Sequence, residues 1–153
     1  MFASASTAAL LAFGILSASQ FAASVQSQSP RQAVGQLVSG GDWPRVLAAI
    51  SSGAADWIAL SPQLAAGTDA VQGAELTRAL AAALPRAPAE VLSVVDLRRS
   101  SVLGVQAVCA APAAGGPAAI NDVREALDLL PDVAAVGRAK SLCLKELALA
   151  AAR

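Results

Sequence analysis

The chain has 153 residues and a formal net charge of zero, because eleven acidic side chains balance eleven basic ones. Hydrophobic residues make up 56% of it and aromatic residues 3%, so we expect one domain with a core of Leu, Val, Ile and two Trp, and no basic face for a nucleic-acid partner. Because histidine is absent, Ser-His-Asp and Cys-His catalysis, histidine-ligated zinc and haem with a proximal histidine are excluded.

The chain opens with an apolar segment. Residues 8–16 (AALLAFGIL) precede the first charged side chain, Arg31, and small residues follow them as far as Ser24. A run of this length is too short to span a bilayer of roughly 30 Å but fits the hydrophobic part of an export signal, although no Lys or Arg precedes it. We predict a signal peptide over residues 1–24, cleaved after Ser19 or Ser24, and a periplasmic or secreted protein with no stable membrane span afterwards. An ordinary N-terminal helix is the alternative.

A polar stretch separates this segment from the rest of the chain. Residues 25–29 (VQSQS) predict a flexible linker, and a single helical domain is expected over residues 30–153. Ser29 and Pro30 have the pattern of an N-cap followed by proline at the first helical position. They predict a short helix over residues 30–38, which the following Gly-Gly pair ends.

The next segment repeats itself at an offset of fourteen residues. In each unit an Asp-Trp pair is followed by two apolar residues at helical spacing and then by a glycine. The corresponding pairs are Asp42/Asp56, Trp43/Trp57, Val46/Leu60, Ile50/Leu64 and Gly53/Gly67. We predict two short helices, each with its Asp at the N-terminus, its Trp buried in the first turn and its Gly in left-handed geometry at the end. Pro62 predicts a kink or restart within the second one.

Further helices are expected to the end of the chain. An amphipathic helix is predicted over residues 69–84, and another begins at Pro88. Residues 102–108 are rich in β-branched side chains, but we predict a helix there because a lone strand would have no partner. Two more helices are expected over residues 120–130 and 132–150, the last with two apolar sides. Together these elements predict an irregular all-α bundle of about six or seven short helices.

Cys109 and Cys143 are the only two cysteines, and both follow the predicted signal. An even number of cysteines in an exported chain predicts a disulfide. Their separation is too large for a CxxC redox or zinc motif. If the chain is not exported, two buried free thiols become the better interpretation.

Few other residues suggest chemistry. Ser141 and Lys145 have the spacing of a Ser–Lys dyad, but helices produce such pairs constantly. Lys140 falls within the apolar stripe of the last helix, where an ion pair with a neighbouring Asp would explain it. Four acids form a stripe that could hold a hard cation, although a solvated helix face explains them better. They are Asp122, Glu125, Asp128 and Asp132.

These exclusions favour a binding function. The sequence contains no P-loop, GxSxG or GxGxxG motif, and we predict no cofactor and no resident metal. We expect an exported, non-enzymatic domain that binds another protein, as an inhibitor, immunity factor or accessory subunit, with Trp43, Trp57 and Lys140 as candidate contacts. The alternative is a small-ligand carrier or an enzyme that uses Asp, Glu, Arg and Lys. A deep pocket with convergent charges would favour the alternative, and a flat apolar patch rimmed by charge the binding protein.

Overall fold

The computed structural model describes residues 16–97 and 101–152, and every regular element within them is a helix. This confirms the all-α class. The helices in chain order are α1 (Ala18–Ser27), α2 (Pro30–Ser39), α3 (Trp43–Ser51), α4 (Ala55–Ala59), α5 (Ser61–Gly67), α6 (Ala70–Ala83), α7 (Pro88–Val94), α8 (Val105–Ala110), the 3-10 helix η1 (Ala111–Gly115), α9 (Gly116–Asp128) and α10 (Ala134–Ala151).

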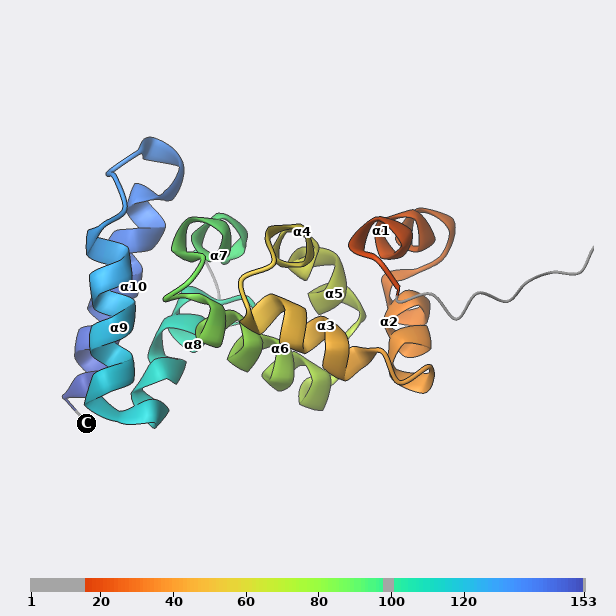
Figure 1. Cartoon of the computed structure of the whole chain (residues 1–153), viewed down its shortest axis with the longest axis horizontal. Coiled ribbons are helices and arrows are strands. Elements are labelled where there is room, and N and C mark those ends of the chain that lie inside the picture. The colour runs from red at the N-terminus through yellow and green to blue at the C-terminus, as the bar shows by residue number, and fades with distance from the viewer. Residues whose placement is uncertain (1–15, 98–100, 153) are drawn as a thin grey trace, which may run out of the picture.

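The helices form an irregular bundle that is drawn out along one axis (Figure 1). Along the upper side in this view, α1, α4 and α7 form a row, while α9 and α10 lie together at the end opposite α1 and α2. Helices pack mainly on others a few places away in the chain: α2 on α5, α3 on α6, α4 on α7 and α8 on α10. The bundle has more helices than predicted, partly because α4 and α5 meet in a break at Leu60 and Ser61, just before Pro62.

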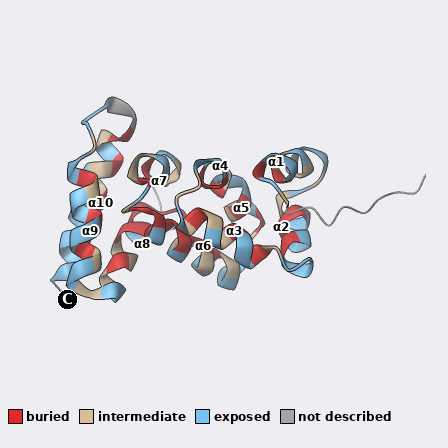
Figure 2. Ribbon diagram, viewed as in Figure 1, coloured by how far each residue is buried: buried red, intermediate tan, exposed pale blue. Residues whose placement is uncertain are grey.

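The core is continuous along this axis. Buried residues lie on the sides of the helices that face their neighbours (Figure 2). Leu, Val and Ile make most of the core, as expected, and one Phe and both Trp complete it. The largest fully buried side chains are Phe21, Ile50, Ile58, Leu64, Leu76, Leu80, Leu84, Leu127 and Leu147.

Capping boxes begin three of the helices, two of them at starts that the sequence predicted. Asp69 begins α6 with a capping box, in which its carboxylate accepts from the Gln72 amide at 2.8 Å. Ser29 does the same for α2, and Pro30 follows it at the first helical position. A third box, between Ser17 and Gln20, begins α1.

The prediction of a flexible linker over residues 25–29 is wrong, because the structure orders these residues. Residues 25–27 are the last turn of α1, and Gln28 and Ser29 make a tight turn into α2. The side-chain amides of Gln28 and Gln36 exchange two hydrogen bonds, of 3.0 and 3.1 Å, which hold the two helices together. Helix α1 also spans both predicted cleavage positions.

The fourteen-residue repeat is confirmed in its apolar positions. Trp43 and Trp57 lie in the first turns of α3 and α4, with 5% and 8% of their surfaces exposed. Ile50 and Leu64 are fully buried. Leu60 is half-buried, because the helical path breaks there.

The two ends of the repeat are only partly as predicted. Gly53 has the expected left-handed backbone, with φ +92°. Gly67 does not; it ends α5 where the helix crosses the start of α2, and lacks a Cβ because the backbone of Pro30 occupies that space. Asp42 caps no amide with its side chain and pairs instead with Arg45 at 3.3 Å, and Asp56 accepts from the Trp57 amide at 2.8 Å.

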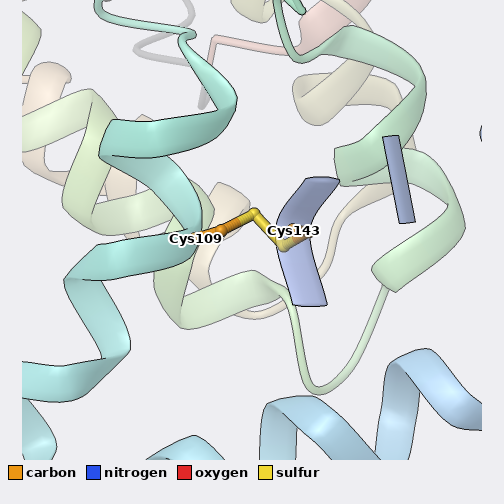
Figure 3. Close-up of a disulfide and its surroundings, with 2 residues drawn as sticks. All are labelled: Cys109 and Cys143. Atoms are coloured by element: carbon orange, nitrogen blue, oxygen red, sulfur yellow. A yellow bond between two sulfur atoms is a disulfide. The ribbon is translucent and has the colours of Figure 1, made fainter. Parts of the chain in front are cut away.

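A disulfide joins the C-terminal helices, as predicted. Cys109 on α8 and Cys143 on α10 are fully buried, and their Cα atoms lie 5.2 Å apart (Figure 3). The helix predicted over residues 102–108 begins later, at Val105, after a turn in which Asp96 and Gly104 form an isolated bridge. The Cys109–Cys143 disulfide anchors α10, the longest of the described helices, to the middle of the bundle.

Candidate functional site

An open groove runs along α9, between this helix and the end of α6. Two adjoining hollows of about 370 Å³ each form it, and both are lined by Pro85, Arg86 and Asp122. We call it the α6–α9 groove. Its floor is made of small and apolar residues: Ala81, Ala82, Pro85, Pro112, Ala119, Val123 and Ala126.

The two rims of the groove carry opposite charges. Arg78 and Arg86 lie on the α6 side, and Asp122 and Glu125 on the α9 side. All four side chains are exposed or largely so, and the two ion pairs found in the described part of the chain involve none of them. Their charges are therefore free to pair with an incoming molecule.

Backbone carbonyls hold both arginines in place. The Arg86 Nη1 donates to the carbonyls of Ala82 at 3.0 Å and Ser51 at 3.4 Å, and the Arg78 Nε donates to the Ala74 carbonyl at 3.3 Å. Each guanidinium keeps further N–H donors for another group, since it has five in all. The rim is thus positioned before anything binds.

The groove ends at an exposed apolar side chain. Leu129, which follows the last turn of α9, is 81% exposed, more than any other large hydrophobic residue described. Val133 nearby in the chain is 49% exposed. An isolated exposed leucine is ordinary, but this one lines the end of the groove together with Pro85 and Ala126 and adds to its apolar lining.

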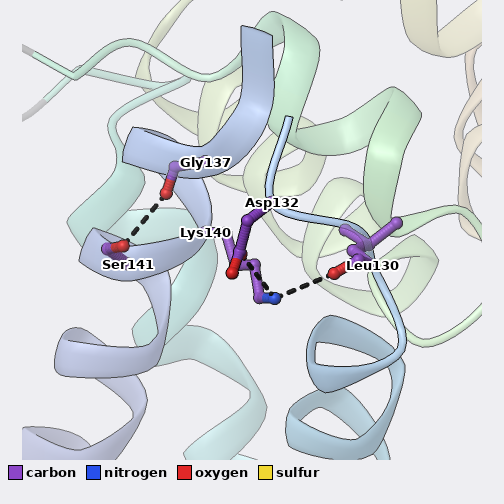
Figure 4. A network of polar contacts seen from close by, with 5 residues as sticks. All are labelled: Leu130, Asp132, Gly137, Lys140 and Ser141. Carbon is purple, nitrogen blue, oxygen red and sulfur yellow. Dashed lines mark hydrogen bonds and ion pairs between the residues drawn. The ribbon is translucent and has the colours of Figure 1, made fainter. Parts of the chain in front are cut away.

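The residues that the sequence proposed as partner contacts lie elsewhere. Both Trp side chains belong to the core, as predicted, and the Trp43 Nε1 donates to Glu75 of α6 at 2.8 Å. Lys140 is also internal: its Nζ donates to the Leu130 carbonyl and pairs with Asp132, both at 2.9 Å (Figure 4). Neither the indoles nor this ammonium lines the α6–α9 groove.

Lys140 fastens the loop between α9 and α10. Its side chain is 12% exposed, so the stem is buried and the charge reaches the loop carbonyl and the largely exposed Asp132. This is the ion pair with a neighbouring Asp that the sequence suggested.

The other candidate chemistries do not assemble. In residues 16–97 and 101–152, no three acidic or cysteine side chains gather as a metal site requires, and the stripe from Asp122 to Asp132 is spread along exposed positions. The Ser141 hydroxyl donates to the Gly137 carbonyl at 3.0 Å, within its own helix (Figure 4). No bond to Lys145 activates it in the described structure.

Of the groove's charged and exposed residues, the sequence singled out Asp122 and Glu125, as part of an acidic stripe, but neither Arg86 nor Leu129. Arg86 stands between two prolines and Leu129 precedes Leu130-Pro131, so the first reads as a turn residue and the second as one of a helix-ending pair. Only the packing of η1 on α6, and of α9 on η1, brings them to one surface. No helix in the described residues has both the length and the apolar character to cross a membrane.

No protein-family model matches this chain, and no curated protein or solved structure is significantly similar to it.

Proposed function

We propose that this protein is a non-enzymatic domain that acts outside the cytoplasm and binds another protein through the α6–α9 groove. The observation that carries the proposal is the combination of an apolar floor, unpaired charges on both rims and the exposed Leu129 at the end. An apolar patch rimmed by charge is typical of a protein-binding surface. The groove is open along its length, whereas a small-molecule site encloses most of its ligand.

The rims define the kind of partner. A helix that lies along α9 would bury its apolar side against the alanines and prolines of the floor. Acidic side chains on one flank would face Arg78 and Arg86, and basic ones on the other flank would face Asp122 and Glu125. We therefore propose an amphipathic helix of the partner, about 20 Å long to match the 13 residues of α9.

Two features support a location outside the cytoplasm. The apolar segment over residues 8–16 fits an export signal. The buried disulfide between Cys109 and Cys143 is of a kind that persists in oxidising compartments and is rare in the cytosol. We propose the periplasm or the extracellular medium, with the disulfide as a permanent part of the fold.

Site-specific photocrosslinking in the native cell tests the binding site. A photoreactive residue in place of Ala82 or Leu129 should give one and the same adduct, identified by mass spectrometry. The matched control replaces Val71, which is 68% exposed at the start of α6, about 16 Å along the helix from Ala82. The adduct should disappear when Arg86→Glu reverses one rim charge. Identical adducts from Val71, or none from the two groove positions, would refute the proposal.

A further inference from the structure

Helix α1 lies on the domain as a ligand helix would. It has an apolar stripe at i, i+3, i+4 and i+7, which consists of Ala18, Phe21, Ala22 and Val25. Phe21 is 1% exposed, and its ring centroid lies 5.9 Å from that of Trp57, with the planes tilted by 42°. This aromatic pair fixes α1 to the row that α4 continues (Figure 1).

The surface that receives α1, the α1 seat, is formed by α2 and by Trp57 of α4. At one end, Leu16 lines a small hollow together with Val46 and Trp57, and at the other Gln28 bonds to Gln36 of α2. No side chain between residues 16 and 28 is charged. The seat therefore accepts an uncharged helix, and Phe21 is its main apolar anchor.

Cleavage after Ser24 would vacate the part of this seat that Ala18, Phe21 and Ala22 fill, whereas Val25 and Gln28 would stay in the mature chain. The cut would remove Ser17 with its capping box, and Phe21 with the whole first part of the stripe. Trp57 would then lose its ring partner and expose its indole beside α2. Trp is among the residues most enriched at the energetic hot spots of protein interfaces.

We propose that export processing after Ser24 converts the α1 seat into a second binding site, for a helix of a partner protein. That helix has the pattern of the removed part of α1: a Phe or similar aromatic residue, with a small residue three positions before it and another directly after it. In the unprocessed chain α1 fills the seat itself, so the site opens only after export. The inference rests on the export part of the proposed function and is independent of the α6–α9 groove.

A peptide-binding experiment on the processed protein tests this. The full chain is exported, and the mature form is purified from that compartment; its intact mass should show that it begins at Val25. A synthetic peptide of residues 16–24, the segment that cleavage removes from the seat, is then titrated against it, with tryptophan fluorescence as the readout. We expect saturable binding, and a Phe21→Ala peptide should bind roughly 10- to 100-fold more weakly, the affinity equivalent of burying one Phe side chain.

Two controls make the result decisive. The unprocessed full chain should not bind the peptide, because its own α1 occupies the seat. In the full chain, Phe21→Ala should make Trp57 more accessible to acrylamide quenching without loss of helical circular dichroism.

Several outcomes would overturn the inference: a mature protein that retains Phe21, one that loses its helical signal after processing, or a folded one to which both peptides bind equally or not at all. Retention of Phe21 and either peptide result leave the crosslinks expected in the α6–α9 groove unchanged, and loss of the helical signal is recognised by circular dichroism itself. Failure of this proposal is therefore distinguishable from failure of the proposed function.

Discussion

Replacing Gly67 with alanine should destabilise the domain, whereas the same substitution at Gly35 should stabilise it. Gly67 ends α5 at the point where this helix packs on α2. A Cβ built there would lie 2.6 Å from the carbonyl carbon of Pro30 and 2.7 Å from Cγ2 of Val34. Because Pro30 contributes backbone atoms, a rotamer change cannot relieve the clash, and α2 and α5 would have to separate.

The size of the effect follows from the cost of overpacking. Forcing extra atoms into a packed interior costs about 1–3 kcal/mol. For a chain of this length, 1 kcal/mol corresponds to about 3 °C, so the Tm of Gly67→Ala should fall by about 3–9 °C. Gly35 lies in the middle of α2, is exposed, and has no atom within 4 Å of its Cβ position. Gly35→Ala should therefore gain about 0.5–1 kcal/mol of helix propensity and raise the Tm by about 2–3 °C.

Thermal and urea unfolding followed by circular dichroism measure both variants under the same conditions. The two substitutions add the same methyl group to glycines in helices that touch each other, so a general effect of Gly→Ala cannot produce opposite signs. An unchanged or raised Tm for Gly67→Ala would show that α2 and α5 do not approach as closely as described.

The core and the disulfide give three further predictions. In the unprocessed chain, Trp57→Ala should cost about 3–5 kcal/mol in the free energy of unfolding, measured by urea titration, because it removes a large buried aromatic; a loss under 1 kcal/mol would contradict its burial. Reduction of the Cys109–Cys143 bond should lower stability by about 3–4 kcal/mol on the chain-entropy model, seen as a lower Tm in a reducing buffer, and the double Cys→Ser variant should be insensitive to that buffer. Lys140→Met should cost about 1–2 kcal/mol, since it leaves the Leu130 carbonyl without its donor, whereas Asp132→Asn should cost less than 1 kcal/mol because that carboxylate is largely exposed. Equal losses for these last two variants, in the same unfolding assay, would place the stabilisation in the ion pair instead.

Local sequence signals predicted most of the helices. The capping pattern at Asp69 and the Ser29-Pro30 pair mark helix starts because their effect depends on backbone groups only three residues away. The cysteine pair was predictable because two cysteines allow a single intramolecular bond. In each case the deciding interaction is short-ranged or has no competitor.

The errors arose where packing decides the conformation. Gly67 was expected to have left-handed backbone geometry like Gly53, but it does not. At Gly67 the close contact with the Pro30 backbone, and not a left-handed turn, requires glycine. Residues 25–29 were expected to be flexible because they are polar, yet the Gln28–Gln36 amide pair orders them. The α6–α9 groove depends on where α9 lies, which no local pattern encodes.

The packing of each helix on others nearby in the chain has a consequence for how the molecule assembles. Most helices from α2 to α7 pack on partners that lie only a few tens of residues away in the sequence. Because contacts between residues close in sequence close short loops, this arrangement favours rapid folding. Because the chain is made from its N-terminus onward, helices α2 to α7 can pack before the segment that carries Cys143 has been synthesised. Helix α10 then docks on α7 and α8 as the last element. The disulfide is therefore expected to form after the helices have packed, so that it stabilises the folded domain without guiding its folding.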